Sequence, residues 1–331
     1  MHPHDFPRAP GRITRRHALA WAAALGAPAL AHAQGDGKPL RVIMPVSAGS
    51  GADGAVRAIS NSLAKALGQP VVIENLPGAG GITGTTQIVR APKDGSVIGV
   101  VSNNHVVNPS VYKNIPFDSL ADITPITILG ATPFVLVAHP SVPARTVQEL
   151  IAYAKAKPGV LNYGSSGNGT ILHLGAAMFV DQARLAIQHI PYKGMGPLMN
   201  DVLGGQVQLA VVAVAPAAAH IKSGALRALG VTTATRVAAL PGVPTIAEQG
   251  LPAYELDGWV APVAPAGLPK AELARLYNGF KAAMEMPEAH DALIAQGYEI
   301  KLTPPEQAAA FFRSEAARMA QVVKNANVRI D

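Results

Sequence analysis

The chain has 331 residues, no Cys, 5% aromatic residues and a formal net charge of +6. A chain of this length predicts about two domains. The absence of Cys excludes a disulfide framework, thiol catalysis and thiolate metal sites.

Residues 1–33 have the features of an export signal. A basic start that includes Arg15 and Arg16 is followed by an apolar run at 18–30, and Ala31-His32-Ala33 fits the small-x-small cleavage rule. We therefore expect a signal peptide cleaved after Ala33 and a mature protein in the periplasm. The paired arginines favour the twin-arginine route over the general one, and the apolar run is too short to span a bilayer.

The charge that remains after cleavage is small. The leader holds four Arg and one Asp, which leaves +3 for the mature chain. That balance is compatible with acidic small ligands, and no basic run typical of nucleic-acid binders is present. No later segment offers about 20 uninterrupted apolar residues, so we expect a soluble mature chain without a nucleic-acid partner.

The first unit after the leader is a strand, a loop of small residues and a helix. Apolar residues predict a strand at 40–44, and helical spacing predicts a helix at 54–67. The unpaired N–H groups and partial positive charge of a helix N-terminus favour an anion. Asp53 can cap this helix, but it also repels an anion that lies too near. The loop at 46–54 is therefore a candidate anion site.

The same loop also fits a nucleotide pattern. Gly49-x-Gly51-x-x-Gly54 matches the dinucleotide fingerprint, and Glu74 stands roughly where a ribose-binding acid belongs. Two observations oppose this interpretation: residues 45–48 separate the strand from the first Gly, and Glu74 runs directly into a second glycine loop at 77–81. An exported nucleotide-dependent oxidoreductase remains an alternative.

The next segments continue an α/β pattern. Strands are predicted at 71–74 and 97–101 and a helix at 83–90, and a polar loop at 102–105 follows the third strand. Ligands of open α/β sheets bind at the carboxyl ends of the strands. Polar or glycine-rich loops after three strands therefore predict a ligand site there.

The middle of the chain repeats the opening theme. Strands at 126–130 and 134–138 form a possible crossing between domains, and Thr146 is the expected N-cap of a helix at 147–155. A strand at 161–164, a polar loop at 165–170 and a helix at 171–180 then offer a second helix N-terminus. We expect this loop to face the first one across a cleft. The remaining predicted strands are 188–190, 207–214, 226–232 and 259–263, and the last of these crosses back. One further helix is predicted to end at 203, and others are predicted at 216–223, 270–284, 288–295 and 305–325.

Three polar side chains near the second loop have two interpretations. His173 lies one turn into its helix, either facing the cleft or, as we prefer, holding the loop by a local hydrogen bond. Either Tyr192 and Lys193 contact a ligand carboxylate, or Lys193 is a solvated surface residue.

The chain offers no arrangement typical of an enzyme. It has no Gly-x-Ser-x-Gly elbow, and its mature histidines have no metal-ligand spacing; they are His105, His139, His173, His189, His220 and His290. We therefore expect no catalysis, no metal and no cofactor.

Six motifs together resemble one family. The chain is similar to the periplasmic substrate-binding proteins of tripartite tricarboxylate transporters, the Bug family, over about 36–329. The motifs are Ala48-Gly49-Ser50 with Asp53 and Arg57, Glu74 to Gly81, Asp94-Gly95, Tyr163 to Leu174, Pro191 to Gly194, and Pro241 to Thr245.

The resemblance implies a two-domain periplasmic binding protein fold of type II-like α/β architecture, with two crossing strands and a ligand cleft between the domains. Domain one would hold 36–132 and 256–331, and domain two 133–255. The ligand is expected to be a small organic carboxylate, the partners membrane permease subunits, and the state a monomer. The implied ligand-binding residues are Ser47, Ala48, Gly49, Ser50, Asp53, Ser165, Gly167, Asn168, Gly169, Thr170 and His173.

The chain departs from the family pattern in ways that bear on the ligand. Ser47 stands where Pro is common and Ser50 where a second Gly is common, and the strand at 211–214 is apolar where polar residues are frequent. The ligand is therefore a di- or tricarboxylate or a more apolar organic acid. A ligand-presenting sensory protein is a further alternative that the sequence leaves open.

Overall fold

The computed structural model describes residues 38–325, so the predicted leader and its cleavage site lie outside the described residues. Within that range the sequence folds as alternating strands and helices around one mixed sheet, ordered β2-β1-β3-β10-β5-β8-β6-β7. No helix in the described part is long and apolar enough to span a membrane.

The first part of the sheet is parallel. Strand β1 (Leu40–Met44) lies between β2 (Val71–Asn75) and β3 (Val97–Ser102), and pairs with both in the same direction. Four of the five β1 residues are at most 2% exposed, as expected for a parallel strand covered on both faces. The helices that follow these strands are α2 (Gly51–Leu67), α3 (Ile82–Val89) after the short turn η1 (Ala79–Gly81), and α4 (Asn104–Val111).

The second part of the sheet repeats this arrangement. Strand β6 (Asn162–Ser165) pairs in parallel with β7 (Gln188–Pro191) and β8 (Leu209–Ala213), and β9 (Arg227–Val231) pairs with β5. The helices here are α5 (Val147–Ala156), α6 (Ile171–Gln182), α7 (Met195–Leu203) and α8 (Val214–Lys222). Thr146 caps α5 as predicted, since its Oγ1 accepts from Glu149 N at 3.1 Å.

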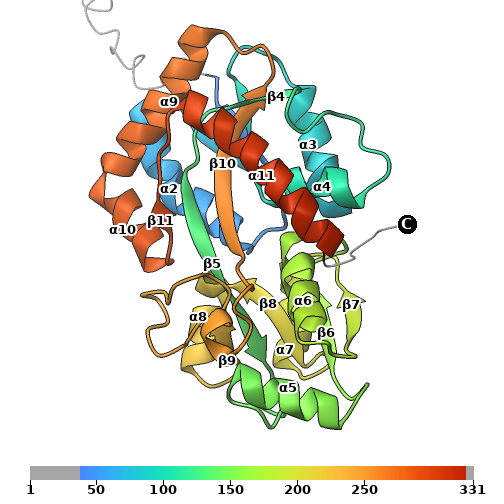
Figure 1. Cartoon of the computed structure of the whole chain (residues 1–331). Helices are drawn as coiled ribbons and strands as arrows, with labels where there is room; N and C mark the ends of the chain where they lie inside the picture. Colours follow the sequence, from blue (N-terminus) through green and yellow to red (C-terminus); the bar gives the residue numbers. More distant parts are fainter. Residues whose placement is uncertain (1–37, 326–331) are drawn as a thin grey trace, which may run out of the picture. The chain divides into compact units, whose positions relative to one another are not determined.

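Two long antiparallel strands join the two parts (Figure 1). Strands β5 (Gly130–Ala138) and β10 (Asp257–Pro265) pair with each other, with Thr132 opposite Gly258. The first residues of β5 pair with β10 and its later residues with β8 and β9. We call β1 to α4 together with the C-terminal helices the first lobe, and α5 to β9 the second lobe.

The crossing corrects one sequence prediction. We expected strands at 126–130 and 134–138 with a break at 131–133, but residues 130–138 form one strand. Pro133 is the last β5 residue paired with β10, and Phe134 is the first paired with β8. The missing N–H of Pro133 thus falls where the strand changes partner and interrupts no ladder.

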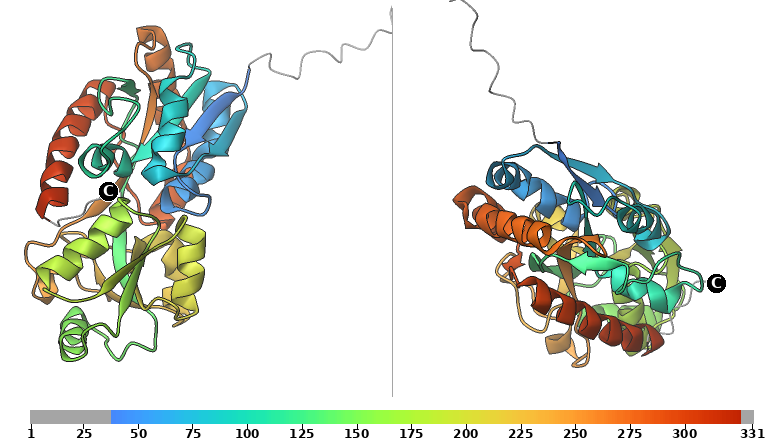
Figure 2. Two further views of the ribbon diagram at one scale, coloured as in Figure 1. Left: turned by 90° about the vertical axis from the view of Figure 1, so that its right-hand side faces the viewer. Right: turned by 90° about the horizontal axis from the view of Figure 1, so that it is seen from above.

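Three helices complete the first lobe. Helices α9 (Lys270–Glu285) and α10 (Pro287–Ala295) pack against α2, and α11 (Pro305–Asn325) packs against α4. Both views in Figure 2 place α11 on the opposite side of this lobe from β1 and β2. Buried Ile59 and Leu63 of α2 share a core with Phe280 and Met284 of α9. The short strands β4 (Ile123–Pro125) and β11 (Glu299–Ile300) pair with β10 and β5.

Helix α4 is the main element that the sequence prediction missed. We expected residues 102–105 to form a polar loop, but Asn103 instead precedes a helix that contains Pro109. The Pro lies in the last turn, and a Pro inside an otherwise helical pattern is a sequence signal for a break. Helix α2 also begins at Gly51, three residues before the predicted start.

Candidate functional site

A cavity of about 640 Å³ is lined by residues of both lobes and of both crossing strands. The first lobe contributes residues that follow β1, β2 and β3, and the second lobe contributes residues that follow β6 and β7 together with Ala213, the last residue of β8. The lining residues used below are Ser47, Ser50, Gly51, Ala52, Gly78, Ala79, Gly80, Gly81, Asn104, Tyr112, Thr132, Phe134, Ser166, Gly167, Asn168, Thr170, Ile171, Leu172, Tyr192, Lys193, Met195, Ala213 and Trp259.

The electrostatics of this cavity favour an anion. Among residues 38–325, its lining holds no Asp or Glu, and Lys193 is its one Lys or Arg. Several helices also begin at the cavity, and their first N–H groups carry partial positive charge. In α2, Ser50 is the N-cap and its Oγ accepts from Asp53 N at 3.3 Å. The N–H groups of Gly51 and Ala52, in the first turn, have no partner within the helix.

The second glycine loop brings more backbone to the same place. Gly78, Gly80 and Gly81 all have positive φ, at 131°, 64° and 100°. A Cβ on Gly81 would lie 3.0 Å from the carbonyl oxygen of Pro45, so the loop after β2 lies directly against the end of β1. Glycine permits both the positive φ and this close approach.

Within the part of the chain that the structure describes, three hydrogen bonds cross the cleft between the lobes. Ser47 Oγ accepts from Met195 N at 3.2 Å, and Asn104 Oδ1 accepts from Ile171 N at 2.7 Å. In addition, the Tyr112 hydroxyl donates to the carbonyl oxygen of Asn168 at 3.0 Å. The first amides of α6 and α7 are therefore already bonded to first-lobe side chains. We call these three contacts the cross-cleft bonds.

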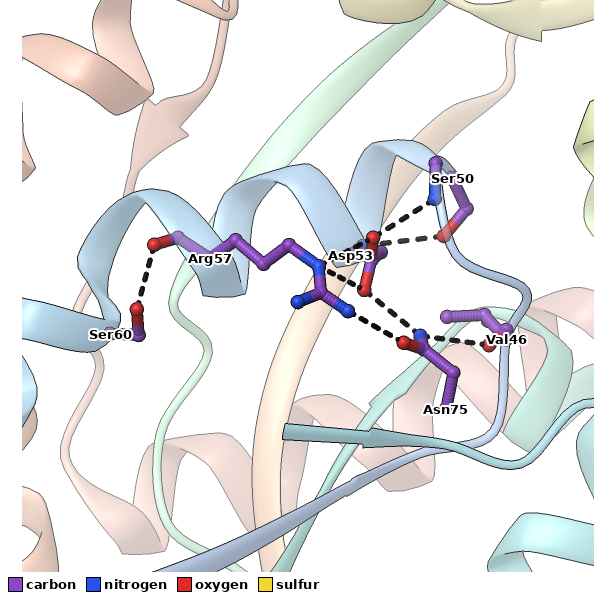
Figure 3. A network of polar contacts seen from close by, with 7 residues as sticks. Val46, Ser50, Asp53, Arg57, Ser60 and Asn75 are labelled. Carbon is purple, nitrogen blue, oxygen red and sulfur yellow. Dashed lines mark hydrogen bonds and ion pairs between the residues drawn. The ribbon is translucent and has the colours of Figure 1, made fainter. Parts of the chain in front are cut away.

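Asp53 fixes the first loop by hydrogen bonds that it makes outside the cavity lining (Figure 3). Its carboxylate accepts from Gly49 N at 2.9 Å, from Arg57 Nε at 3.0 Å and from Asn75 Nδ2 at 2.9 Å. Burial raises the pKa of Asp53, but the hydrogen bonds from Arg57, Gly49 and Asn75 outweigh burial and lower it overall. Asn75 Nδ2 also donates to the carbonyl oxygen of Val46. The ionised carboxylate thus fixes the loop and lies outside the cavity lining.

Two stacked histidines support the second loop in the same way. The rings of His173 and His189 lie 3.8 Å apart and nearly parallel. His173 Nδ1 accepts from Gly169 N at 3.1 Å, and His189 Nε2 lies 2.7 Å from Ser165 Oγ. Burial, together with the neighbouring His189, lowers the pKa of His173 to about 3, and burial lowers that of His189 to about 4. Both rings are therefore neutral at pH 7. The local hydrogen bond that we preferred for His173 is present.

The predicted ligand-binding residues divide into two sets. Those that line the cavity are Ser47, Ser50, Gly167, Asn168 and Thr170; those that lie outside its lining are Ala48, Gly49, Asp53, Ser165, Gly169 and His173. The second set belongs to the same loops, and its bonded members Gly49, Asp53, Ser165, Gly169 and His173 hold them in shape. Ligand contact by any of these residues stays a prediction.

The sequence pointed to some lining residues and missed others. Tyr192 and Lys193, which the sequence singled out, line the cavity, and Lys193 is exposed. Thr132, Phe134 and Trp259 also line it because the crossing strands form part of its wall, and the predicted crossing was the signal that could have found them. Tyr112 gave no signal, since it follows the unpredicted helix α4.

Two sequence arguments change with the geometry. Glu74 forms an ion pair with Arg41 at 2.8 Å and lies outside the cavity lining, so it does not occupy a ribose-binding position there. Of the apolar segment 211–214, only Ala213 lines the cavity, and its neighbours are buried in the core. The apolar wall comes instead from Phe134, Ile171, Leu172 and Met195.

Two α/β lobes joined by two antiparallel crossing strands, with a cavity between them, define a two-domain periplasmic binding protein fold. Comparison with known proteins agrees. The chain belongs to the tripartite tricarboxylate transporter family receptors, whose sequence model matches residues 55–328.

Relatives of known sequence or structure match most of the chain. BugT of Bordetella pertussis is 33% identical over 295 residues, covering 88% of this chain and 90% of its own. A solved protein of R. palustris, Rpa4515 with adipate, is 29% identical with a TM-score of 0.85, covering 90% of this chain and all of its own. MatC of Rhodopseudomonas palustris with bound malate is 26% identical with a TM-score of 0.81, covering 86% and 98%.

Proposed function

We propose that this protein is a periplasmic receptor that captures a small organic carboxylate and delivers it to the permease subunits of a tripartite membrane transporter. The observation that carries the proposal is the cavity between the lobes, which is lined by helix N-termini and Lys193 and, within the described part of the chain, by no acidic side chain. Adipate and malate in two solved relatives support a carboxylate as the anion.

The lining also supports a ligand with a short apolar body. Phe134, Ile171, Leu172 and Met195 are apolar side chains of the wall, and ligand pockets combine such surfaces with a few placed polar groups. A di- or tricarboxylate places its charged ends on the helix N-termini, and its methylene groups against these side chains. A more apolar acid places its body on the same wall.

Membership of the family supports the remaining parts of the proposal. The receptor binds its ligand without converting it, uses no cofactor, and reaches the periplasm by means of the leader at 1–33. The domain boundaries that we propose are 36–132 with 256–331 and 133–255, with closure as a hinge motion about β5 and β10. The loops at 46–54 and 165–170 bind the ligand from opposite sides.

A carboxylate panel tests the proposal. The panel is malate, adipate, citrate and benzoate, and the matched controls are malamide and adipamide, which keep the shape of two panel acids without their charge. An acid at 100 times its dissociation constant stabilises the folded state by about 2.7 kcal/mol, which raises the melting temperature by roughly 5–10 °C. Isothermal titration then measures the affinity. The proposal is wrong if no acid binds, or if the amides bind as tightly as the acids.

A further inference from the structure

Two serine hydroxyl groups on the first-lobe side of the cavity still have protons to donate. Ser47 lines the cavity, and its Oγ accepts from Met195 N at 3.2 Å. Ser50 also lines the cavity, and its Oγ accepts from Asp53 N at 3.3 Å. A hydroxyl group carries one donor beside its acceptor lone pairs, and within the described part of the chain neither serine side chain donates a hydrogen bond. Both protons are therefore available to a carboxylate, together with the first-turn amides of α2 that have no partner within the helix.

The hydroxyl groups of the second lobe are instead committed inside the protein. Those that line the cavity belong to Ser166, Thr170 and Tyr192. Tyr192 donates to Asp201 Oδ2 at 2.8 Å, and Thr170 donates to the carbonyl oxygen of Gly167 at 2.9 Å. Ser166 donates to Thr170 Oγ1 at 3.3 Å. Each of these hydroxyl groups has therefore given its one proton to another group of the protein.

The helices of the second lobe also leave few amides for a ligand. In α6, the amide of Ile171 donates to Asn104 Oδ1 at 2.7 Å, so a side-chain oxygen already takes the place of an anion there. The next amide, that of Leu172, has no partner within the helix, but a carboxylate that accepted from it would lie close to this oxygen and be repelled. Helix α8 adds no donor, because its first turn, which begins at Val214, lies outside the cavity lining.

The start of α7 is closed to an anion in a different way. Its first amide, from Met195, donates to Ser47 Oγ at 3.2 Å. Its second residue, Gly196, lies outside the cavity lining. Its third residue is Pro197, which has no N–H. Although several helices of the second lobe begin near the cavity, they are therefore poorly equipped to hold a carboxylate.

The second-lobe side chains that remain are polar groups in solvent and an apolar surface. Asn168 and Lys193 line the cavity and are exposed, so water and salt weaken their contacts with an anion. Ile171, Leu172 and Met195, the second-lobe part of the apolar wall, are at most 8% exposed. Such a surface stabilises a ligand by removing apolar area from water.

We propose that the ligand is a monocarboxylate with an apolar body. Its one carboxylate is held by Ser47, Ser50 and the first turn of α2, and its body is covered by the apolar wall. This inference rests on the proposed function above and narrows it to one class of acid. An acid with a second carboxylate must bury that charge against the second lobe, where few donors offset the loss of water, or leave the charge in solvent and the wall uncovered.

The first experiment measures three acids on the wild-type protein by isothermal titration. Hexanoate has one carboxylate, adipate has the same chain length with two, and monomethyl adipate keeps the adipate chain with one charge. We expect adipate to bind on the order of tenfold or more weakly than hexanoate, because its second carboxylate loses water without gaining equivalent hydrogen bonds. Monomethyl adipate should bind within a few-fold of hexanoate, which separates the effect of charge from that of length.

The second experiment changes the apolar wall and leaves the glycine loops intact. Met195→Gln replaces an apolar side chain by a polar one of similar length, so it should weaken hexanoate binding several-fold and narrow the gap between hexanoate and adipate. The matched control is Met199→Gln, one turn further along α7, at a buried side chain outside the cavity lining. Both variants should lower the melting temperature, but Met199→Gln should keep the wild-type affinity for both acids.

The outcomes separate this inference from the proposed function. Adipate binding as tightly as hexanoate, or more tightly, overturns the inference and leaves a carboxylate receptor in place. Unchanged hexanoate affinity in Met195→Gln also overturns it, because the second lobe would then not cover the body of the ligand. If the wild-type protein binds neither these acids nor any acid of the panel, the proposed function fails and this inference fails with it.

Discussion

The cross-cleft bonds are expected to set the fraction of protein molecules whose two lobes are in contact. Ser47, Asn104 and Tyr112 each supply one side-chain oxygen to a backbone group of the second lobe. A neutral hydrogen bond contributes about 0.5–1.5 kcal/mol net, so each bond shifts the equilibrium between the contacting and separated lobes by roughly 2- to 13-fold. All three together contribute about 1.5–4.5 kcal/mol, if they add.

The perturbation is the triple variant Ser47→Ala, Asn104→Ala and Tyr112→Phe, compared with the three single variants. If ligand binds only when the lobes are in contact, the apparent dissociation constant rises as that fraction falls. We expect single variants to weaken binding slightly and the triple variant to weaken it by tenfold or more. Small-angle scattering of the ligand-free triple variant should show a larger radius of gyration than wild type.

A control separates these effects from general loss of stability. Thr146→Ala removes a hydrogen bond of the same kind, from Glu149 N at 3.1 Å, but within the second lobe. It should lower the melting temperature while both the affinity and the scattering profile stay at wild-type values. The reasoning is refuted if the triple variant keeps the wild-type radius of gyration and affinity.

Three further predictions concern the loops and the cavity charge. His173 and His189 have folded-state pKa values of about 3 and 4, below the ordinary 6.5, so the unfolded state binds more protons between pH 6.5 and 4. Stability that is present above pH 6.5 should therefore fall as the pH decreases through that range. In urea unfolding, the free energy of the His173→Gln, His189→Gln double variant should depend less steeply on pH than that of wild type, and equal slopes would contradict this. Lys193→Ala should weaken binding less than tenfold at 0.15 M salt and more at low salt, because the side chain is exposed and its charge is screened by salt. Titration at two ionic strengths measures this effect. A complete loss of binding at 0.15 M salt would mean that a formal charge holds the anion. Gly49→Ala should lower the melting temperature by a few degrees, because the φ of Gly49 is +77° and a Cβ there carries a penalty on the order of 1 kcal/mol even in open space. The control is Gly196→Ala, which also places a Cβ in open space but at a residue without positive φ, and it should not lower the melting temperature. Equal effects of the two variants would argue against a backbone origin.

Much of the fold was predictable because the strands are short apolar runs with clear stops. The predicted strands at 40–44 and 71–74 and the helices at 147–155 and 305–325 lie within a residue or so of the observed ones. The crossing was harder to predict, since Pro133 marks a change of strand partner rather than an end. That distinction depends on tertiary pairing, which a local pattern does not contain.

The candidate site was predictable at the level of loops and less so at the level of atoms. Small residues after a strand predict a helix N-terminus open to an anion, and both predicted loops contribute to the cavity lining. Which amides stay free depends on partners distant in sequence: Asn104 bonds to Ile171, 67 residues away, and Ser47 to Met195, 148 residues away. No spacing rule within either loop contains that information.

The two lobes are consequently not equivalent, although their sequences repeat the same strand–loop–helix unit. The first amides of α6 and α7 bond to first-lobe side chains, whereas the amides of Gly51 and Ala52 in the first turn of α2 have no partner within the helix and belong to residues that line the cavity. The cross-cleft bonds therefore use different amides from those that α2 leaves for a ligand. The variants Asn104→Ala and Tyr112→Phe should change the affinity for all acids of the panel by a common factor. A single series of titrations over the carboxylate panel tests this, because a change in lobe contact alone leaves the ratio of two dissociation constants unaltered, and altered ratios would mean that these side chains also contact the ligand.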